Sequence, residues 1–507
     1  MAEKYILVID EGTTGTRALV IDRMSQVKGG SYTELTQHHP AADRVEHDAE
    51  EIWTASCAMI EAAMREAGVS LRDIAAIGIT NQRATTVVWD RKTAKPITPA
   101  IVWQDTRTAN YIETIRRSWA DKVYGRTGWA LAPVYSSLSL QWILDNVPGA
   151  RRKANDGDLC FGTIDSWLIY KLTGGRTHAI AASNASVTGA YDLLADCWYR
   201  EWLDFLGLPL NLFPEVRDDS GDFGVTDATT FGASIPVTGA IADQHAALFA
   251  QGCVYPGTVK CTHGTGTFLD MNIGPVPIIS SRGLNSIIAY RRNGHTTYGL
   301  EGYAAVTGAA VQWLRDGAEM IRSSAETEAL ATSVPDNGGT YFVPALTGLS
   351  APYWDSFARG LLIGISPGTR RAHIVRAVLE GIVFSVKDFL ETMKSDSGVE
   401  FKSIKVDGGA AQNDFLLQFQ ADMLDVEVDR PVNKETTSLG AAYMAGLSVG
   451  FWNSPEECFT NQKMDKTFRP KMSEQERERL YGCWQQAVQR AMKWIQVTEP
   501  KAEVVTA

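Results

Sequence analysis

Two stretches with the same pattern constrain the fold of this chain more than any other feature. Residues 5–22 read YILVIDEGTTGTRALVID, so two runs of β-branched and aliphatic residues enclose Asp10 and a turn of glycines and threonines. Residues 257–271 read GTVKCTHGTGTFLDM and again place a Gly-Thr-Gly-Thr turn between two strand-like runs. Each pattern predicts a β-hairpin whose turn presents backbone N–H groups to an anion. Two such turns suggest two similar domains.

The spacing of apolar residues elsewhere indicates an α/β layered architecture. Strand-like runs alternate with helical patterns in the first ninety residues, at Tyr5–Ile9, Ala18–Asp22, Ile74–Thr80 and Thr85–Asp90. A helix is expected after Asp48, with Asp48 as its N-cap and Glu51 as the capping-box partner. Gly68 is expected to end this helix.

The length of 507 residues exceeds what a single hydrophobic core usually holds. A boundary near residue 250 places one glycine-threonine turn in each half, so we predict an N-terminal domain at 1–250 and a C-terminal domain at 251–507. A ligand of two such domains is expected in the cleft between them. We expect that cleft to narrow when its ligands bind.

Composition narrows the classes of function. The net charge of −11 gives no electrostatic footprint for nucleic acid or an anionic membrane. The N-terminus lacks the features of a signal peptide and no apolar stretch approaches the length of a membrane span, which predicts a cytoplasmic protein. Seven cysteines without a CxxC pair are typical of unpaired thiols in a reducing compartment.

Phosphate binding is the function that the turns favour. One turn alone would satisfy hairpin geometry without any ligand. A third glycine cluster, DGGAAQN at 407–413, follows another strand-like run. Three such clusters make it less plausible that the glycines serve turn geometry alone. A carboxylate beside such a turn, as at Asp10, is a usual anchor for hydrated Mg²⁺. No GxxxxGK[ST] or strand-linked GxGxxG occurs, and the DFG at 222–224 lacks the other protein-kinase motifs and is expected to be a surface turn.

Asp243, in GAIADQHAALF, is the best candidate for a general base. Phosphoryl transfer needs a group that accepts the proton of the attacking hydroxyl. Asp243 follows an apolar strand-like run and opens a helical pattern, so a helix N-cap would also explain it. The residues alone leave both roles open.

Many blocks of the sequence resemble, in order and over nearly the full length, the glycerol kinase branch of the FGGY family of sugar and polyol kinases. The blocks are DEGTTGTRA, GITNQR, AIVWQDTRT, FGTIDSWLIYKLTG, ADQHAALF, GTGTF, EGYAAVTGAAVQWLRD, PALTGLSAPYWD, VDGGAAQNDFLLQFQAD and TTSLGAAYMAG. The segment Gly360–Gly381 also resembles the second signature of the family. The resemblance implies two ribonuclease H-like domains of the actin, hexokinase and Hsp70 type around a cleft, and ATP-dependent phosphorylation with Mg²⁺.

Carried over to this sequence, the resemblance makes Asp243 the general base and Asp10 a Mg²⁺ ligand through water, with Asp243 close to the same ion. It implies that the nucleotide is bound by Thr13, Thr14, Arg17, Thr265, Gly308, Gln312, Gly409 and Asn413. It implies that the polyol is bound by Arg83, Trp103, Gln244, Phe268 and Asp243. A homodimer or homotetramer is also common among such kinases.

Three positions depart from the glycerol enzymes. Ala84 stands where they carry a glutamate, Val134 stands where they carry a pocket tyrosine, and Ser139 replaces a lysine of the first signature. The tyrosine of this segment, Tyr135, stands one residue after the position of the pocket tyrosine. The space at Ala84 and Val134 predicts a four-carbon polyol such as erythritol or threitol, with Arg83 and Tyr135 or a water as partners.

Two alternatives remain open from the sequence. Tyr135 could fill the place of the missing tyrosine and water that of the glutamate, which would leave a weaker glycerol kinase that makes glycerol 3-phosphate. A more remote alternative is a non-enzymatic nucleotide switch of the actin or Hsp70 type.

Overall fold

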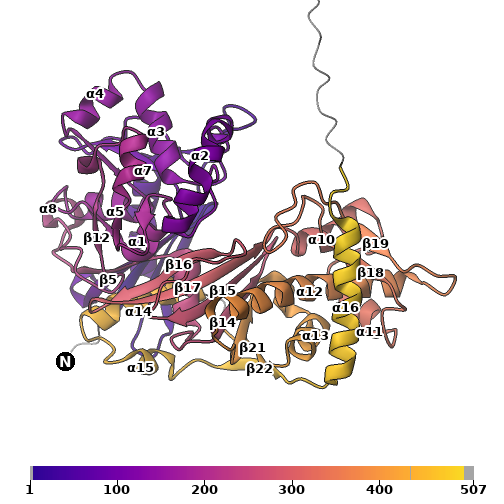
Figure 1. Cartoon of the computed structure of the whole chain (residues 1–507). Helices are drawn as coiled ribbons and strands as arrows, with labels where there is room; N and C mark the ends of the chain where they lie inside the picture. Colours follow the sequence, from indigo (N-terminus) through magenta and orange to yellow (C-terminus); the bar gives the residue numbers. More distant parts are fainter. Residues whose placement is uncertain (1–3, 434, 496–507) are drawn as a thin grey trace, which may run out of the picture.

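The computed structural model describes residues 4–433 and 435–495. Figure 1 shows two lobes, the first built from the indigo to magenta part of the chain and the second from the pink to yellow part. Each lobe is organised around one large sheet with helices on its faces. The predicted two-domain α/β fold is therefore confirmed.

The first sheet has the strand order β13-β5-β1-β2-β3. Its strands are β1 (Tyr5–Glu11), β2 (Gly15–Ile21), β3 (Val27–Glu34), β5 (Ile74–Asn81) and β13 (Val237–Ala242). Strand β1 is antiparallel to β2 and parallel to β5, and β13 is parallel to β5. Three predicted strands lie here. The fourth, at 85–90, instead forms the shorter β6 (Val87–Asp90), which pairs with β8 (Leu159–Gly162) outside this sheet.

The second sheet has the order β16-β17-β15-β14-β20-β21-β22. Its strands are β14 (Thr258–His263), β15 (Thr267–Gly274), β16 (Asn285–Arg292), β17 (His295–Ala304), β20 (Ser403–Asp407), β21 (Val428–Pro431) and β22 (Met464–Phe468). Strands β14 and β15 form a hairpin, β15 and β17 are antiparallel, and β20 and β21 continue the sheet in parallel. The five strands β21-β20-β14-β15-β17 thus repeat the order and directions of the first sheet.

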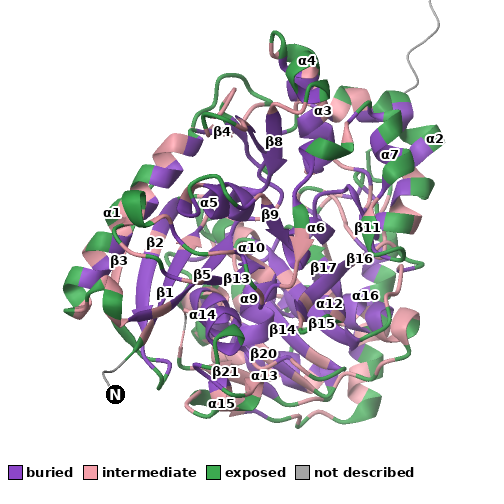
Figure 2. Ribbon diagram, turned by 90° about the vertical axis from the view of Figure 1, so that its left-hand side faces the viewer, coloured by how far each residue is buried: buried purple, intermediate pink, exposed green. Residues whose placement is uncertain are grey.

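Helices cover both sheets (Figure 2). The first half contains α1 (Ala49–Ala67), α2 (Ala109–Thr127), α3 (Ser136–Asn146), α4 (Ala150–Asn155), α5 (Ile164–Leu172), α6 (Ala182–Ser186), α7 (Arg200–Phe205), α8 (Ala228–Phe231) and α9 (Asp243–Ala250). The second half contains α10 (Gly308–Gln312), α11 (Glu326–Thr332), α12 (Arg371–Ser397), α13 (Asp414–Leu424), α14 (Thr436–Ser448), α15 (Pro455–Phe459) and α16 (Glu474–Ala491). Short paired strands complete the chain: β4 (Glu46–His47), β7 (Ala100–Ile101), β9 (Ala179–Ala181), β10 (Tyr191–Asp192), β11 (Cys197–Trp198), β12 (Glu215–Arg217), β18 (Tyr341–Val343) and β19 (Leu361–Ile363).

Helix α1 begins and ends where the sequence predicts. Asp48 caps it by accepting a hydrogen bond from the Glu50 N–H, and Gly68 ends it with a φ of 67°. The predicted capping box is wrong in one respect, because the Glu51 carboxylate accepts hydrogen bonds from the Thr36 N–H and hydroxyl instead. The apolar face of the helix packs in the core of the first half.

Helix α14 crosses from the second half of the sequence to the first sheet. Its buried face shares a core with Ile6 and Val8 of β1. A Cβ at Gly78 would lie 2.4 Å from the Ala441 carbonyl oxygen, so the helix rests directly on the backbone of β5. The boundary predicted near residue 250 separates the two sheets in sequence, but α14 belongs to the core of the first.

Two further expectations concern single segments. Phe223 of the DFG triplet is fully buried in the first core, so the prediction of a plain surface turn is wrong for that residue. Asp222 is exposed as expected. Among the residues that the structure describes, no helix has both the length and the apolar character needed to cross a membrane.

Candidate functional site

A cavity of about 720 Å³ opens in the second half. Five of the eight residues predicted to bind nucleotide line it: Thr265, Gly308, Gln312, Gly409 and Asn413. The sequence reasoning missed other lining residues, among them Arg315, Thr327, Glu328 and Leu379. A mixed lining of this kind, with apolar side chains and a few polar groups, suits a purine nucleoside.

Close backbone contacts build one wall of this cavity. The turn between β14 and β15 accepts two backbone hydrogen bonds from the start of α10. The Gly308 N–H donates to the Gly264 carbonyl at 3.0 Å, and the Ala309 N–H donates to the Thr265 carbonyl at 3.1 Å. A Cβ at Gly308 would lie only 2.6 Å from the Gly264 oxygen. Gly408 follows β20 with a φ of 93° and leads into the short turn Gly409–Gln412. Glycine is required at both places, which explains the clusters seen in the sequence.

The other three predicted phosphate contacts belong to the β1–β2 hairpin of the first half. The Thr13 hydroxyl accepts a hydrogen bond of 2.9 Å from the Trp103 indole, which joins this turn to the predicted polyol site. Arg17 forms an ion pair with Glu435, directly before α14. The Thr14 carbonyl accepts from the Leu35 N–H at 3.0 Å.

Asp10 lies near the end of β1, beside the first turn, and stands opposite Arg17 in the register of β1 and β2. Its carboxylate accepts a hydrogen bond from the Ser438 hydroxyl of α14. Burial raises the pKa of Asp10 to about 6, and the negative charge of Asp243 contributes to the rise. A buried carboxylate whose pKa is raised by a second carboxylate nearby fits a hydrated divalent cation, because Mg²⁺ is commonly bound by one or two carboxylates plus substrate phosphates.

Asp243 is the first residue of α9 and follows β13. Ala242 is the N-cap residue of that helix, and the Asp243 carboxylate accepts a hydrogen bond from the Gln244 N–H at its start. About 30% of its side chain is exposed, and the Arg83 guanidinium lies 3.6 Å from its Oδ1. Burial raises the pKa of Asp243 above the usual value for aspartate, while Arg83 opposes that rise. A carboxylate with raised proton affinity at an open edge is suited to accept a proton.

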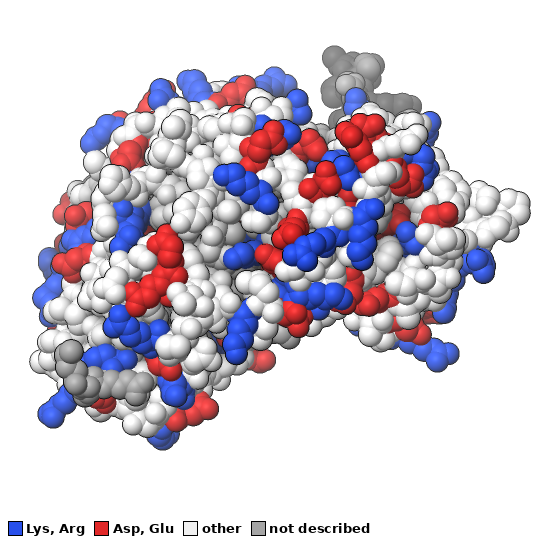
Figure 3. Space-filling model, turned by 90° about the horizontal axis from the view of Figure 1, so that it is seen from below, with Lys and Arg blue, Asp and Glu red and all other residues white. Residues whose placement is uncertain are grey.

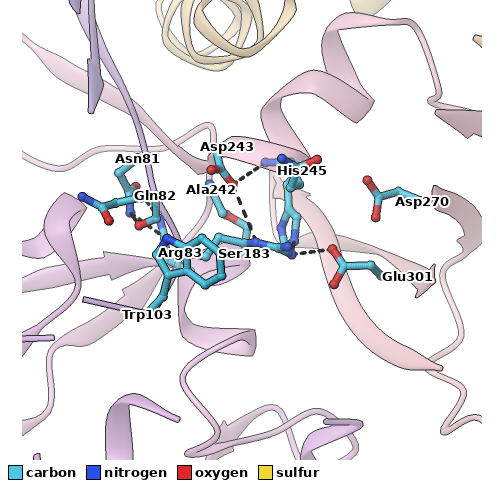
Figure 4. A network of polar contacts seen from close by, with 12 residues as sticks. Asn81, Gln82, Arg83, Trp103, Ser183, Ala242, Asp243, His245, Asp270 and Glu301 are labelled. Atoms are coloured by element: carbon cyan, nitrogen blue, oxygen red, sulfur yellow. Dashed lines mark hydrogen bonds and ion pairs between the residues drawn. The ribbon is translucent and has the colours of Figure 1, made fainter. Parts of the chain in front are cut away.

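Arg83 connects Asp243 to the second half (Figure 4). Its guanidinium donates a 2.6 Å hydrogen bond to the Glu301 carboxylate of β17. It also stands over two aromatic rings, 5.6 Å from the centre of Trp129 and 5.7 Å from that of Phe268. Only 12% of the Arg83 side chain is exposed, so its direction is fixed by these neighbours.

The aromatic residues of the predicted polyol site remain accessible. Trp103 exposes 38% of its surface. Phe268 is half-buried and packs against Tyr303, with 4.5 Å between the ring centres. Gln244 is half-buried beside Asp243, and its backbone N–H donates to the Asp243 carboxylate at 2.7 Å.

The three departures from the glycerol enzymes do not all border this space. Ala84 is 4% exposed with a φ of 61°, and its carbonyl accepts a hydrogen bond from the Ser136 hydroxyl at 2.9 Å. Val134 is half-buried and packs against the apolar cluster around α3. Ser139 is 5% exposed within α3.

The expected substrate contact from Tyr135 is contradicted by its surroundings. The side chain is fully buried in the core around α3. Its hydroxyl donates to the Trp129 carbonyl and lies 3.3 Å from the Thr127 hydroxyl. A Cβ at Gly189 would be 2.2 Å from the tyrosine ring, so the ring is packed tightly. Tyr135 therefore supplies no free hydroxyl to a ligand.

Four buried residues around the site escaped the sequence reasoning: Glu301, His245, Lys260 and Asp270. Three of them are charged residues that the strands β14, β15 and β17 bury, and a charged side chain within a strand-like run is the signal that could have identified them. His245 lies 3.5 Å from Arg83, and burial holds its pKa well below the usual value. Among the described residues, no group of three or more His, Cys, Asp or Glu is arranged to hold a metal ion.

Two sheets of one topology, with a glycine-walled cavity on one and an arginine-carboxylate edge on the other, are the arrangement of the actin-like ATPase fold. The comparisons with known families agree with this. Residues 5–250 match the N-terminal domain and residues 259–449 the C-terminal domain of the FGGY family of carbohydrate kinases. The chain belongs to this family.

Individual relatives are similar over nearly the whole chain. A protein of Petrotoga mobilis named glycerol kinase is 50% identical over 97% of this chain and 99% of its own length. Glycerol kinase 2 of Thermotoga maritima is 49% identical over the same shares of the two chains. The crystal structure of Plasmodium falciparum glycerol kinase with ADP superposes with a TM-score of 0.92 at 32% identity, covering 98% of this chain and 99% of that one.

Proposed function

We propose that this chain transfers the terminal phosphoryl group of ATP to a terminal hydroxyl of a small polyol. The observation that carries the proposal is the pairing of Asp243 with Arg83 at an open edge, with the accessible rings of Trp103 and Phe268 beside it. A polyol presents both hydroxyls and a carbon backbone, and this edge offers a partner for each. The cavity of the second half would hold the adenosine.

In the proposed reaction, Asp243 accepts the proton of the attacking hydroxyl as its oxygen bonds to phosphorus and ADP leaves. Arg83 fixes the remaining hydroxyls, and Gln244 lies beside the base. Thr13, Thr14 and Arg17 face the phosphates from the first half and Thr265 from the second. Asp10 and Asp243 would hold a hydrated Mg²⁺, which would neutralise the phosphate charge.

The preferred substrate in this proposal has four carbons, as erythritol and threitol do. Ala84 carries no group that could replace a glutamate, and the Tyr135 hydroxyl is used within the core. Loss of a charged hydrogen-bond partner costs about 1.5–3 kcal/mol and loss of a neutral one about 0.5–1.5 kcal/mol. Glycerol would lose both, whereas a longer polyol gains contacts from its additional carbon and hydroxyl.

Glycerol is the second candidate substrate. It is favoured by the names of the relatives that are about half identical over the whole chain. In this alternative, ordered water replaces the glutamate and the tyrosine, because the core position of Tyr135 removes the simpler replacement.

A screen of ADP release decides between these substrates. It covers glycerol, erythritol, both threitols, the pentitols, dihydroxyacetone and erythrulose, with and without Mg²⁺. The four-carbon proposal fails if the catalytic efficiency for glycerol is about tenfold or more above that for every four-carbon polyol. If no polyol or sugar is phosphorylated, the enzyme assignment itself fails and the nucleotide-switch alternative takes its place.

We further propose that domains 1–250 and 251–507 approach each other when ATP and substrate bind, which expels water from the transferring group. Small-angle scattering with and without ligands tests this, because an unchanged radius of gyration contradicts closure.

The family resemblance also supports a cytoplasmic homodimer or homotetramer. Light scattering at micromolar concentration measures the assembly.

A further inference from the structure

Three buried charged side chains and the half-buried Asn285 form one row across the second sheet. The strand register places Lys260 of β14 opposite Asp270 of β15, Asp270 opposite Glu301 of β17, and Glu301 opposite Asn285 of β16. Directly opposed residues in a sheet point to the same face. On the same face, the next opposed pair toward the turn between β14 and β15 is Phe268 and Tyr303. This polar row therefore lies beside the aromatic part of the proposed polyol site.

Two members of the row bind residues of the first half that we place on the substrate. Glu301 accepts the hydrogen bond of Arg83 at 2.6 Å. Lys260 donates to the side-chain oxygen of Gln244 and, at 2.9 Å, to the Asp270 carboxylate. Both Lys260 and Asp270 are fully buried. The row therefore supports the two polar side chains that flank Asp243.

The contact with Lys260 determines which end of the Gln244 amide is available. A lysine ammonium has three hydrogen-bond donors and no acceptor. The atom of Gln244 that faces Lys260 must therefore be its oxygen. The NH₂ group then points away from Lys260 with two donors free.

We infer that Lys260, held in place by Asp270, is a positioning residue that fixes Gln244 with its NH₂ group toward the substrate. Gln244 then donates to a substrate oxygen that accepts, while Asp243 takes a proton from the hydroxyl that reacts. This inference rests on the proposed function of the site. It extends that function by assigning a hydrogen-bond direction to one substrate oxygen and by giving a purpose to a fully buried ion pair.

A purely structural role is the competing explanation of the pair. Buried ion pairs add little to stability compared with apolar residues of similar size, whereas removal of one partner alone is strongly destabilising. The double substitution Lys260→Met with Asp270→Leu therefore removes the contact to Gln244 without leaving a buried charge from the pair. It separates positioning from folding.

The test compares the kinetics of this double variant with those of the wild type, using the polyol that the wild type phosphorylates best. We expect the KM for the polyol to rise about 3- to 10-fold, the effect of one misdirected hydrogen bond. We expect kcat and the ADP affinity to change by less than about twofold, because Asp243 and the nucleotide cavity are untouched. Lys405→Met serves as the matched control, since Lys405 stands in register beside Lys260 on β20 and is half-buried; its KM should equal that of the wild type.

A double-mutant cycle then asks whether Lys260 acts through Gln244. In a Gln244→Ala background, the Lys260→Met and Asp270→Leu substitutions should raise KM no further. An unchanged polyol KM in the folded double variant overturns the inference, and so does an equal rise in KM with and without the Gln244 side chain. Retained ADP binding and an unchanged thermal melting curve establish that the variant is folded. Failure of the wild type to phosphorylate any polyol would instead overturn the proposed function.

Discussion

In the first half, charged residues stand where the strands end: Asp10 near the end of β1, Arg83 shortly after β5 and Asp243 directly after β13. In the second half, β14 and β20 lead instead into glycine loops. The two sheets share a strand order, so matching strand ends can be compared directly. In the first half, side-chain charge makes the site. In the second, closely packed backbone does. One scaffold thus carries the proposed proton transfer on one side and the proposed nucleotide site on the other.

The sharpest way to break this comparison is to remove one charge from the first half. Asp243→Asn keeps the size of the side chain but cannot accept the proton, so turnover should fall by roughly 10²–10⁴-fold. ADP affinity should remain, because the cavity belongs to the second half. Steady-state kinetics and calorimetric ADP titration measure the two effects. A near-normal rate would remove Asp243 from the mechanism.

The raised pKa of Asp243 adds a pH dependence to the same experiment. A general base must be ionised, so the rate of the wild type should fall as the pH decreases through the raised pKa. The fall should begin at a higher pH than expected for an ordinary aspartate. The residual rate of Asp243→Asn should lack this acid limb.

The next largest effect concerns the substrate. Ala84→Glu combined with Val134→Tyr restores the groups found in the glycerol enzymes. A regained charged hydrogen bond is worth roughly 10- to 150-fold in binding, so the ratio of catalytic efficiencies should shift toward glycerol by at least about tenfold. Kinetics with glycerol and erythritol measure the ratio. If the ratio stays constant, these two positions do not set the preference.

In the second half, the corresponding experiment adds a methyl group to the backbone. Gly308→Ala would place a Cβ 2.6 Å from the Gly264 carbonyl oxygen. Overpacking costs about 1–3 kcal/mol, which corresponds to roughly 5- to 150-fold weaker ADP binding if it distorts the cavity wall. Gly482→Ala in α16 is the matched control, because its Cβ meets no atom within 4 Å. Equal ADP affinity in both variants would contradict a wall that depends on this glycine.

The same contrast explains what the sequence could reveal. The glycine turns were predictable because a hairpin turn is set by residues that are neighbours in sequence, and five predicted nucleotide residues do line one cavity. The surroundings of Arg83 could not be predicted in this way, since Glu301 lies 218 residues away in sequence. Tyr135 shows the same limit: its neighbours in sequence suggest a pocket residue, and only the packing of Gly189 and Trp129 around it places it in the core.

A contrast in stability rather than in activity distinguishes two matched positions at the hairpin ends, Glu11 of β1 and His263 of β14. Glu11 is fully buried, and its Oε2 accepts a 2.8 Å hydrogen bond from Thr16, while Oε1 has no partner among the described residues. Burial raises the pKa of Glu11 to about 8. His263 has both ring nitrogens in hydrogen bonds, to Thr267 and Gln420, and burial lowers its pKa.

These pKa directions predict different slopes of stability against pH. Because the pKa of Glu11 is higher in the folded state than in the unfolded chain, its ionisation destabilises the fold progressively as the pH rises from about 4.5 to about 8. Each pKa unit of difference corresponds to about 1.4 kcal/mol. Glu11→Gln should therefore flatten the decline of the melting temperature of the ligand-free protein between pH 5 and about 8. His263→Gln should steepen the decline below about pH 6.5, since an unfolded histidine binds a proton there that the buried histidine of the folded state does not, and it should leave the slope unchanged above that pH. Parallel melting curves for wild type and Glu11→Gln would show that the buried carboxyl does not titrate as inferred.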